Sequence, residues 1–171
     1  MKTIILPGYS PHNRDWAIEL KKNINLGHEI MVHEWRHWKN SLSLSTSLSL
    51  NYELKKIREE VGEDEFNIIG KSVGARIAIR VITELREKVN KVIICGVASI
   101  SVDSQKAYIK ALTTFPPDKI IVFQNSSDPI VPYSKVKVFI RNISPEIIII
   151  EKPRSDHHYP YPTDFLKFLS E

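Results

Sequence analysis

A serine lies between two glycines at the point where the sequence changes from a strand pattern to a helix pattern. The run is Gly70-Lys71-Ser72-Val73-Gly74; it follows an apolar, β-branched stretch at 66–69 and precedes an amphipathic stretch at 77–85. A serine in such a sharp turn needs small residues two positions before and after it, because side chains there would clash. The pattern predicts that the Ser72 hydroxyl is a nucleophile held above a sheet, where the helix N-terminus favours developing negative charge.

A serine hydroxyl needs a base to become reactive, and that base needs an acid to orient it. The order expected along the chain is serine, acid, histidine. Asp128 follows the strand pattern at 119–124, at the edge of a parallel sheet where ligands bind; alone, its Asp-Pro dipeptide would be read as a turn or a cap. His157 and His158 follow the last strand pattern. We predict Asp128 as the acid and His157 as the base. His157 is preferred because an Asp-His pair commonly begins this loop in enzymes whose serine, acid and histidine follow this order along the chain. His158 is the alternative base.

Acyl transfer also needs donors for the oxyanion that forms on the substrate. One predicted donor is the backbone N–H of Val73, directly after the nucleophile. The other comes from the loop after the first strand, where Gly8 permits a close approach and the backbone N–H of Tyr9 is the expected donor.

The sequence predicts no metal site and no cofactor. His12, His28, His33 and His37 lack the spacing of a metal-binding helix, so structural roles are expected for them. Cys95 is the one cysteine and lies in an apolar strand pattern, where it is expected to pack as a small apolar residue.

Short apolar runs alternate with amphipathic stretches, which is typical of a parallel sheet covered by helices on both faces. The predicted strands are Thr3–Leu6, Glu29–Glu34, Glu65–Ile69, Lys91–Gly96, Lys119–Gln124 and Glu146–Glu151. The predicted helices are Asp15–Asn25, one from Leu50 to Val61 that stops at Gly62, one that begins after Ser72 and continues to Leu85, Ser104–Thr113, Tyr133–Asn142 and Thr163–Ser170.

Serine and leucine alternate between Ser41 and Leu50 with a period of two. The first interpretation is an extended loop that places its leucines on the body of the protein. The alternative is that this stretch forms part of the wall of an acyl pocket.

The chain has 171 residues, and no linker or repeat divides it, so one domain over residues 1–171 is expected. The net charge of +4 comes from basic residues spread along the chain, which makes nucleic acid an unfavoured partner. No apolar run approaches the length of a membrane span. A cytoplasmic protein, as a monomer or homodimer acting on a small-molecule acyl substrate, is the expectation.

These residues resemble the α/β-hydrolase superfamily over nearly the whole chain. The run Leu6-Pro7-Gly8-Tyr9-Ser10 with Asn13 and Trp16, and the pair Trp35 and Trp38, are similar to small serine hydrolases of the retinoblastoma-binding-protein-9 type. The resemblance implies a minimal α/β-hydrolase fold that lacks the first two strands of the full fold. That fold is a three-layer α/β/α sandwich around a six-stranded parallel sheet in the order 2-1-3-4-5-6, without an inserted lid.

Two positions depart from the family pattern. Lys71 stands where histidine is frequent, and Pro7-Gly8 stands where His-Gly is common. Neither change removes a group that the chemistry requires. A solvated Lys71 side chain is expected, and the alternative is that Lys71 places positive charge near the site.

The sequence thus predicts hydrolysis of an ester-type substrate by Ser72, His157 and Asp128. Thioester or amide hydrolysis by the same groups is the nearest alternative. Two rival hypotheses are a non-catalytic binding protein of the same fold and a flavodoxin-like nucleotide binder, for which the run at 7–11 is a poor phosphate loop. The rings of Tyr9, Trp16, Trp35, Trp38 and Tyr159 are expected either to line a shallow pocket or to pack in the core.

Overall fold

The computed structural model describes residues 1–40 and 47–171 and contains one six-stranded sheet. The strands are β1 (Lys2–Leu6), β2 (Glu29–Val32), β3 (Phe66–Lys71), β4 (Val89–Cys95), β5 (Ile120–Asn125) and β6 (Ile148–Lys152). Their order is β2-β1-β3-β4-β5-β6, and every neighbouring pair is parallel. The fold class and strand order expected from the resemblance are therefore confirmed.

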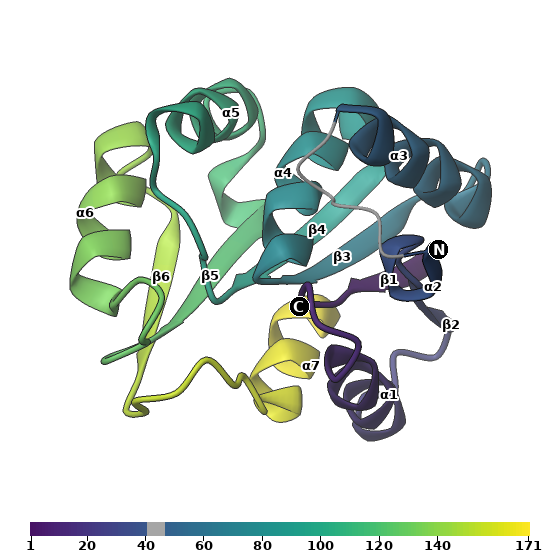
Figure 1. Ribbon diagram of the computed structural model, residues 1–171, viewed down its shortest axis with the longest axis horizontal. Coiled ribbons are helices and arrows are strands. Elements are labelled where there is room, and N and C mark those ends of the chain that lie inside the picture. Colours follow the sequence, from purple (N-terminus) through teal and green to yellow (C-terminus); the bar gives the residue numbers. More distant parts are fainter. Residues whose placement is uncertain (41–46) are drawn as a thin grey trace.

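Helices cover both faces of the sheet (Figure 1). The helices are α1 (Asn13–Asn23), α2 (His37–Asn40), α3 (Ser47–Val61), α4 (Val73–Leu85), α5 (Val102–Leu112), α6 (Tyr133–Ile143) and α7 (Pro162–Ser170), with short 3-10 turns η1 (Arg86–Lys88) and η2 (Pro117–Lys119). Helices α3, α4, α5 and α6 lie on one face, and α1 and α7 lie on the other, which gives the three expected layers.

Alternation along the strands builds two cores, one on each face of the sheet. In β4, Val92 and Ile94 pack in the core beneath α3 to α6, whereas Ile93 and Cys95 pack toward α1 and α7. The other central strands alternate in the same way, because successive side chains of a strand point to opposite faces. The predicted burial of Cys95 is confirmed, and burial raises the pKa of its thiol to about 12, so it stays protonated near neutral pH.

The six predicted strands are all present, each with ends within two residues of the expected ones. Helix α2 was not predicted. The serine–leucine stretch was predicted as an extended loop, and this is wrong for residues 47–50, which belong to α3. Its remaining residues, 41–46, lie outside the described part of the chain. In that described part, no helix is long and apolar enough to span a membrane.

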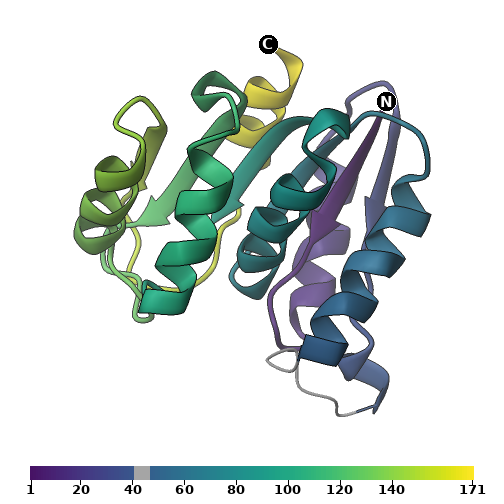
Figure 2. The same ribbon diagram turned by 90° about the horizontal axis from the view of Figure 1, so that it is seen from above.

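The carboxyl ends of the strands face one edge of the sheet, where the helices that follow β3, β4 and β5 begin (Figure 2). Ser72 follows β3, the loop at 7–12 follows β1, and the loops at 126–132 and 153–161 follow β5 and β6. The fold therefore collects the predicted site residues at a single edge.

A buried histidine joins the end of β2 to α3. His33 is fully buried, and its ring contacts two carboxylates: Nε2 lies 2.9 Å from Glu53 and Nδ1 lies 2.7 Å from Glu60. Burial alone would lower the pKa of His33, but the two carboxylates outweigh it and raise the pKa above its ordinary value. His33 is therefore a structural residue, whose two ring nitrogens both face carboxylates.

This arrangement predicts how stability depends on pH. Because the pKa of His33 is higher in the folded state, its contribution is fully present below the unfolded pKa of about 6.5 and is lost as pH rises through the folded pKa. We expect the difference in unfolding free energy between wild type and His33→Gln to shrink as pH rises from about 6 to about 9. Urea unfolding at each pH measures it, and a difference that is constant across this range would contradict the prediction.

Candidate active site

The backbone of Ser72 is strained. Its φ is 57° and its ψ is −114°. Among the described residues, Ser72 is the only non-glycine residue with a positive φ. It joins the end of β3 directly to the first residue of α4, and its N–H donates to the Cys95 carbonyl over 3.0 Å. Such strain is retained where the surrounding structure enforces it, which is typical of functional turns.

The two glycines of the motif allow backbones to touch. A Cβ atom on Gly74 would lie 1.8 Å from the carbonyl oxygen of Leu6, and one on Gly70 would lie 2.7 Å from the carbonyl oxygen of Gly74. Helix α4 therefore begins in direct contact with the end of β1, as the small-residue requirement predicts. This contact brings Ser72 next to the loop that follows β1.

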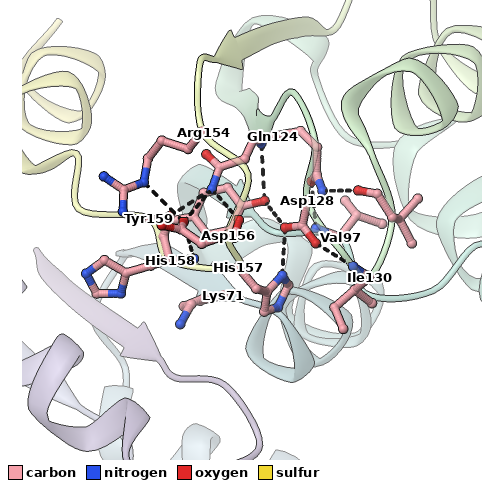
Figure 3. Close-up of polar contacts among 12 residues, drawn as sticks. Lys71, Val97, Gln124, Asp128, Ile130, Arg154, Asp156, His157, His158 and Tyr159 are labelled. Carbon is pink, nitrogen blue, oxygen red and sulfur yellow. Dashed lines mark hydrogen bonds and ion pairs between the residues drawn. The ribbon is translucent and has the colours of Figure 1, made fainter.

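Asp128 and His157 are hydrogen-bonded (Figure 3). His157 Nδ1 donates to Asp128 Oδ2 over 2.7 Å, and the Tyr159 hydroxyl donates to the same oxygen over 2.5 Å. The second carboxylate oxygen accepts the N–H of Ile130 over 2.8 Å. Burial raises the pKa of Asp128, but these three hydrogen bonds lower it by more, so the net pKa is below the ordinary value. Asp128 is therefore ionised near neutral pH.

The bond to Asp128 also sets the tautomer of His157. An ionised carboxylate only accepts, so Nδ1 carries the proton and Nε2 of the neutral ring carries a lone pair. Within the described residues, Nε2 is buried and has no hydrogen-bond partner. His157 thus holds an unused acceptor, the state that a general base requires.

Strand register places His157 beside Ser72. Lys71 and Cys95 are paired across β3 and β4, so Ser72 and Gly96 follow at the same level. A Cβ atom on Gly96 would lie 2.9 Å from Cε1 of His157 and 2.6 Å from Cε2 of Tyr159. The imidazole of His157 therefore packs over Gly96, which lies across from Ser72 at the end of the neighbouring strand. The structure brings Asp128 and His157 into direct contact and places the His157 ring over Gly96, while Ser72 lies at the end of the neighbouring strand β3 and no hydrogen bond to His157 Nε2 occurs among the described residues.

His158 lies differently from its neighbour. Figure 3 shows its ring turned away from Asp128, and its side chain is exposed. Asn125 fixes this loop by donating to the carbonyls of Asp156 and His158 over 2.8 and 2.9 Å. Asp156 pairs with Arg154 and accepts the His158 N–H, so its contacts order the loop. The geometry thus favours His157 over the alternative base.

The two predicted oxyanion donors lie on adjoining backbone segments. Val73 is the first residue of α4, where N–H groups have no acceptor within the helix. Tyr9 lies in the loop after β1, and the preceding Pro7 carbonyl would be 2.7 Å from a Cβ atom on Gly74. Gly8 packs closely on the Asn13 side chain, which leaves no room for a side chain of its own.

The expectation of a solvated Lys71 is wrong. Its side chain is only 5% exposed, its Nζ donates to Asn13 Oδ1 over 2.6 Å, and it lies 5.2 Å from the centre of the Trp16 ring. Burial lowers its pKa, while the negative charges of Asp128 and Asp156 act in the opposite direction. Asn13 also donates to the Ser10 carbonyl, so Lys71 connects the serine turn to the loop after β1.

Sequence reasoning missed two contributions to this site, the burial of Lys71 and the bond from the Tyr159 hydroxyl to Asp128. Tyr159 was expected only as a pocket or core residue. Tyr159, Trp16 and Trp35 are buried core residues, whereas the Tyr9 ring is 50% exposed.

His33 has a structural role, as expected, and no group of three potential metal ligands occurs within residues 1–40 and 47–171.

Comparisons with known proteins bear on the fold. No family model and no curated protein matches the chain. Among solved structures, α/β hydrolase domain-containing protein 10 from mouse is 17% identical, with 98% of this chain and 87% of that one covered and a TM-score of 0.70. The chain has an α/β-hydrolase fold.

Two further structures support the same conclusion. An α/β serine hydrolase without a lid from Xanthomonas campestris is 16% identical, covers 98% of this chain and 78% of that one, and has a TM-score of 0.68. A predicted CIB-like hydrolase from Thermoplasma acidophilum is 18% identical, covers 99% and 84%, and has a TM-score of 0.70. At these identities the likeness concerns the fold, and the roles of individual residues rest on the geometry above.

Gly96 offers a test of the packing around His157. Gly96 and Gly62 both have a φ of 64°, but only Gly96 has neighbours that an added methyl group would meet. Gly96→Ala should lower the unfolding free energy by about 1–3 kcal/mol more than Gly62→Ala, because both share the backbone cost and only Gly96→Ala displaces rings. Urea denaturation of both variants measures this, and equal losses would refute the packing argument.

Proposed function

We propose that the protein is a serine hydrolase that transfers the acyl group of a small ester-type substrate to water. The observation that carries this proposal is the pairing of His157 Nδ1 with the buried Asp128, which leaves a buried, unpartnered Nε2 on a ring that packs over Gly96, at the strand end that neighbours the strained Ser72. Leaving a buried acceptor unpaired costs free energy. Among the described residues, His37 Nδ1 shares this state, but the other nitrogen of His37 binds a backbone carbonyl, whereas that of His157 binds a buried carboxylate.

In the proposed reaction, Ser72 Oγ attacks the carbonyl carbon while His157 Nε2 takes the hydroxyl proton. The tetrahedral intermediate collapses when the bond to the leaving alcohol breaks and His157 returns the proton to that alcohol. Water then attacks the acyl-enzyme with the same base, the carboxylic acid leaves, and Ser72 regains its proton. Asp128 stays ionised throughout and stabilises the imidazolium, which accords with its lowered pKa.

The N–H groups of Val73 and Tyr9 are the proposed donors to the oxyanion. Both belong to backbone segments held in contact by Gly74, so their positions are set before substrate binds. Preorganised donors of this kind are typically worth about 3 kcal/mol each to the transition state.

Hydrolysis of p-nitrophenyl butyrate tests the proposal. Ser72→Ala and His157→Asn should each reduce kcat by about 10³-fold or more, because each removes a member of a unit that acts together. His158→Asn should retain activity, since its ring does not contact Asp128. Ser170→Ala, at the exposed end of α7, is the matched serine control.

Three outcomes would count against the proposal in different ways. Equal turnover by wild type and Ser72→Ala would remove Ser72 from the reaction. A folded wild-type protein that neither hydrolyses esters nor reacts with a fluorophosphonate probe at Ser72 would be a binding protein of this fold. Faster turnover of the matching butyryl thioester or anilide would retain the mechanism and replace the ester as the preferred bond.

A further inference from the structure

Side chains after β2 hold the loop that carries the proposed Tyr9 donor. The indole N–H of Trp35 donates to the Pro7 carbonyl over 3.2 Å. The Tyr9 carbonyl accepts two bonds, from His37 Nε2 over 2.7 Å and from the Trp38 indole over 2.8 Å. Three donors within four residues thus bind two carbonyls of one short loop.

The burial of these donors fixes their geometry. Trp35 is fully buried and His37 is 8% exposed. The His37 ring stacks on the Tyr9 ring with 4.4 Å between centroids. Because Nε2 donates to a carbonyl, the neutral His37 ring carries its proton there, and its buried Nδ1 has no partner among the described residues. The ring therefore has one productive orientation and one tautomer.

The donor segment is itself anchored at both sides. The His33 N–H donates to Ile5 in β1 over 3.0 Å, and its ring binds Glu53 and Glu60 of α3. The Arg36 N–H donates to Glu53 over 2.9 Å. The donors are thus attached to the sheet and to a helix.

Holding the Pro7 and Tyr9 carbonyls constrains the peptide unit between them. Peptide units are planar and trans, so a fixed carbonyl also fixes the plane and the opposed N–H of its own unit. The Pro7–Gly8 and Tyr9–Ser10 units are therefore set, and the Tyr9 N–H, in the single unit between them, keeps little freedom. A donor that shifts by about 1 Å can cost about 10²-fold in rate.

We infer that Trp35, His37 and Trp38 are positioning residues of the proposed hydrolase, which hold the Tyr9 N–H where the oxyanion forms. This inference rests on the proposed function. It assigns to the histidine and the two tryptophans a role in kcat that neither core packing nor substrate contact would give them.

The test removes the N–H donors and keeps the rings. Trp35→Phe and Trp38→Phe should each lower kcat for p-nitrophenyl butyrate by about 10-fold, and Trp38→Phe with His37→Phe by about 10²-fold, the cost of losing one oxyanion donor. KM should stay within about 3-fold of wild type, because the donors act on the transition state. In the Trp38→Phe background, His37→Gln, which keeps a side-chain N–H, should avoid most of the further loss that His37→Phe causes.

The control is Tyr108→Phe, which removes one polar atom from a buried ring in α5, away from the loop. It should leave kcat unchanged. Circular dichroism and thermal melting identify the variants that fold. If the double variant does not fold, the single variant Trp38→Phe tests the inference, because Trp38 is only partly buried.

The outcomes separate the inference from the proposed function. If Ser72→Ala abolishes hydrolysis but folded Trp35→Phe and Trp38→Phe keep wild-type kcat, the positioning role is wrong and the hydrolase stands. A raised KM at unchanged kcat would make these rings substrate contacts and would also overturn it. If wild type and Ser72→Ala turn over the ester equally, the proposed function fails and the inference fails with it.

Discussion

The geometry of the candidate site depends on one backbone contact, between the start of α4 and the end of β1. Gly74 lies against the Leu6 carbonyl so closely that no side chain fits between them. This contact fixes the height of Ser72 above the sheet and places the loop at 7–10 beside it. Lys71 reinforces the same junction, because it reaches Asn13, which in turn binds Ser10. Ser72 and the proposed oxyanion loop are therefore positioned as one unit.

The features that local patterns encode could be predicted from the sequence. Each strand is a short, mostly apolar run, and the parallel arrangement follows from the amphipathic helices between these runs. Ser72 could be recognised because its turn needs glycines at fixed spacing. Asp128 and His157 could be proposed because each follows a strand, and parallel strands end at one edge.

The features that depend on pairing between distant residues could not be predicted. Nothing near Tyr159 in the sequence indicates that its hydroxyl binds Asp128, and nothing near His33 indicates two glutamates from α3. The burial of Lys71 depends on α1 packing over the end of β3, which brings Asn13 and Trp16 to it. A lysine in a polar turn is expected in solvent unless such partners are known.

Asp156 and Asp128 both lie close to His157, but their surroundings give the two carboxylates different roles. Asp156 lies on a loop, pairs with Arg154 and caps the His158 N–H, so its charge serves loop order. Asp128 is buried, and two of its three hydrogen bonds converge on the oxygen that faces the imidazole. A buried carboxylate held ionised by donors has no water to satisfy it, so its charge acts on His157 at low screening. Direct contact with Nδ1 and burial together therefore distinguish Asp128 from Asp156 and suit it to the proposed role of stabilising an imidazolium.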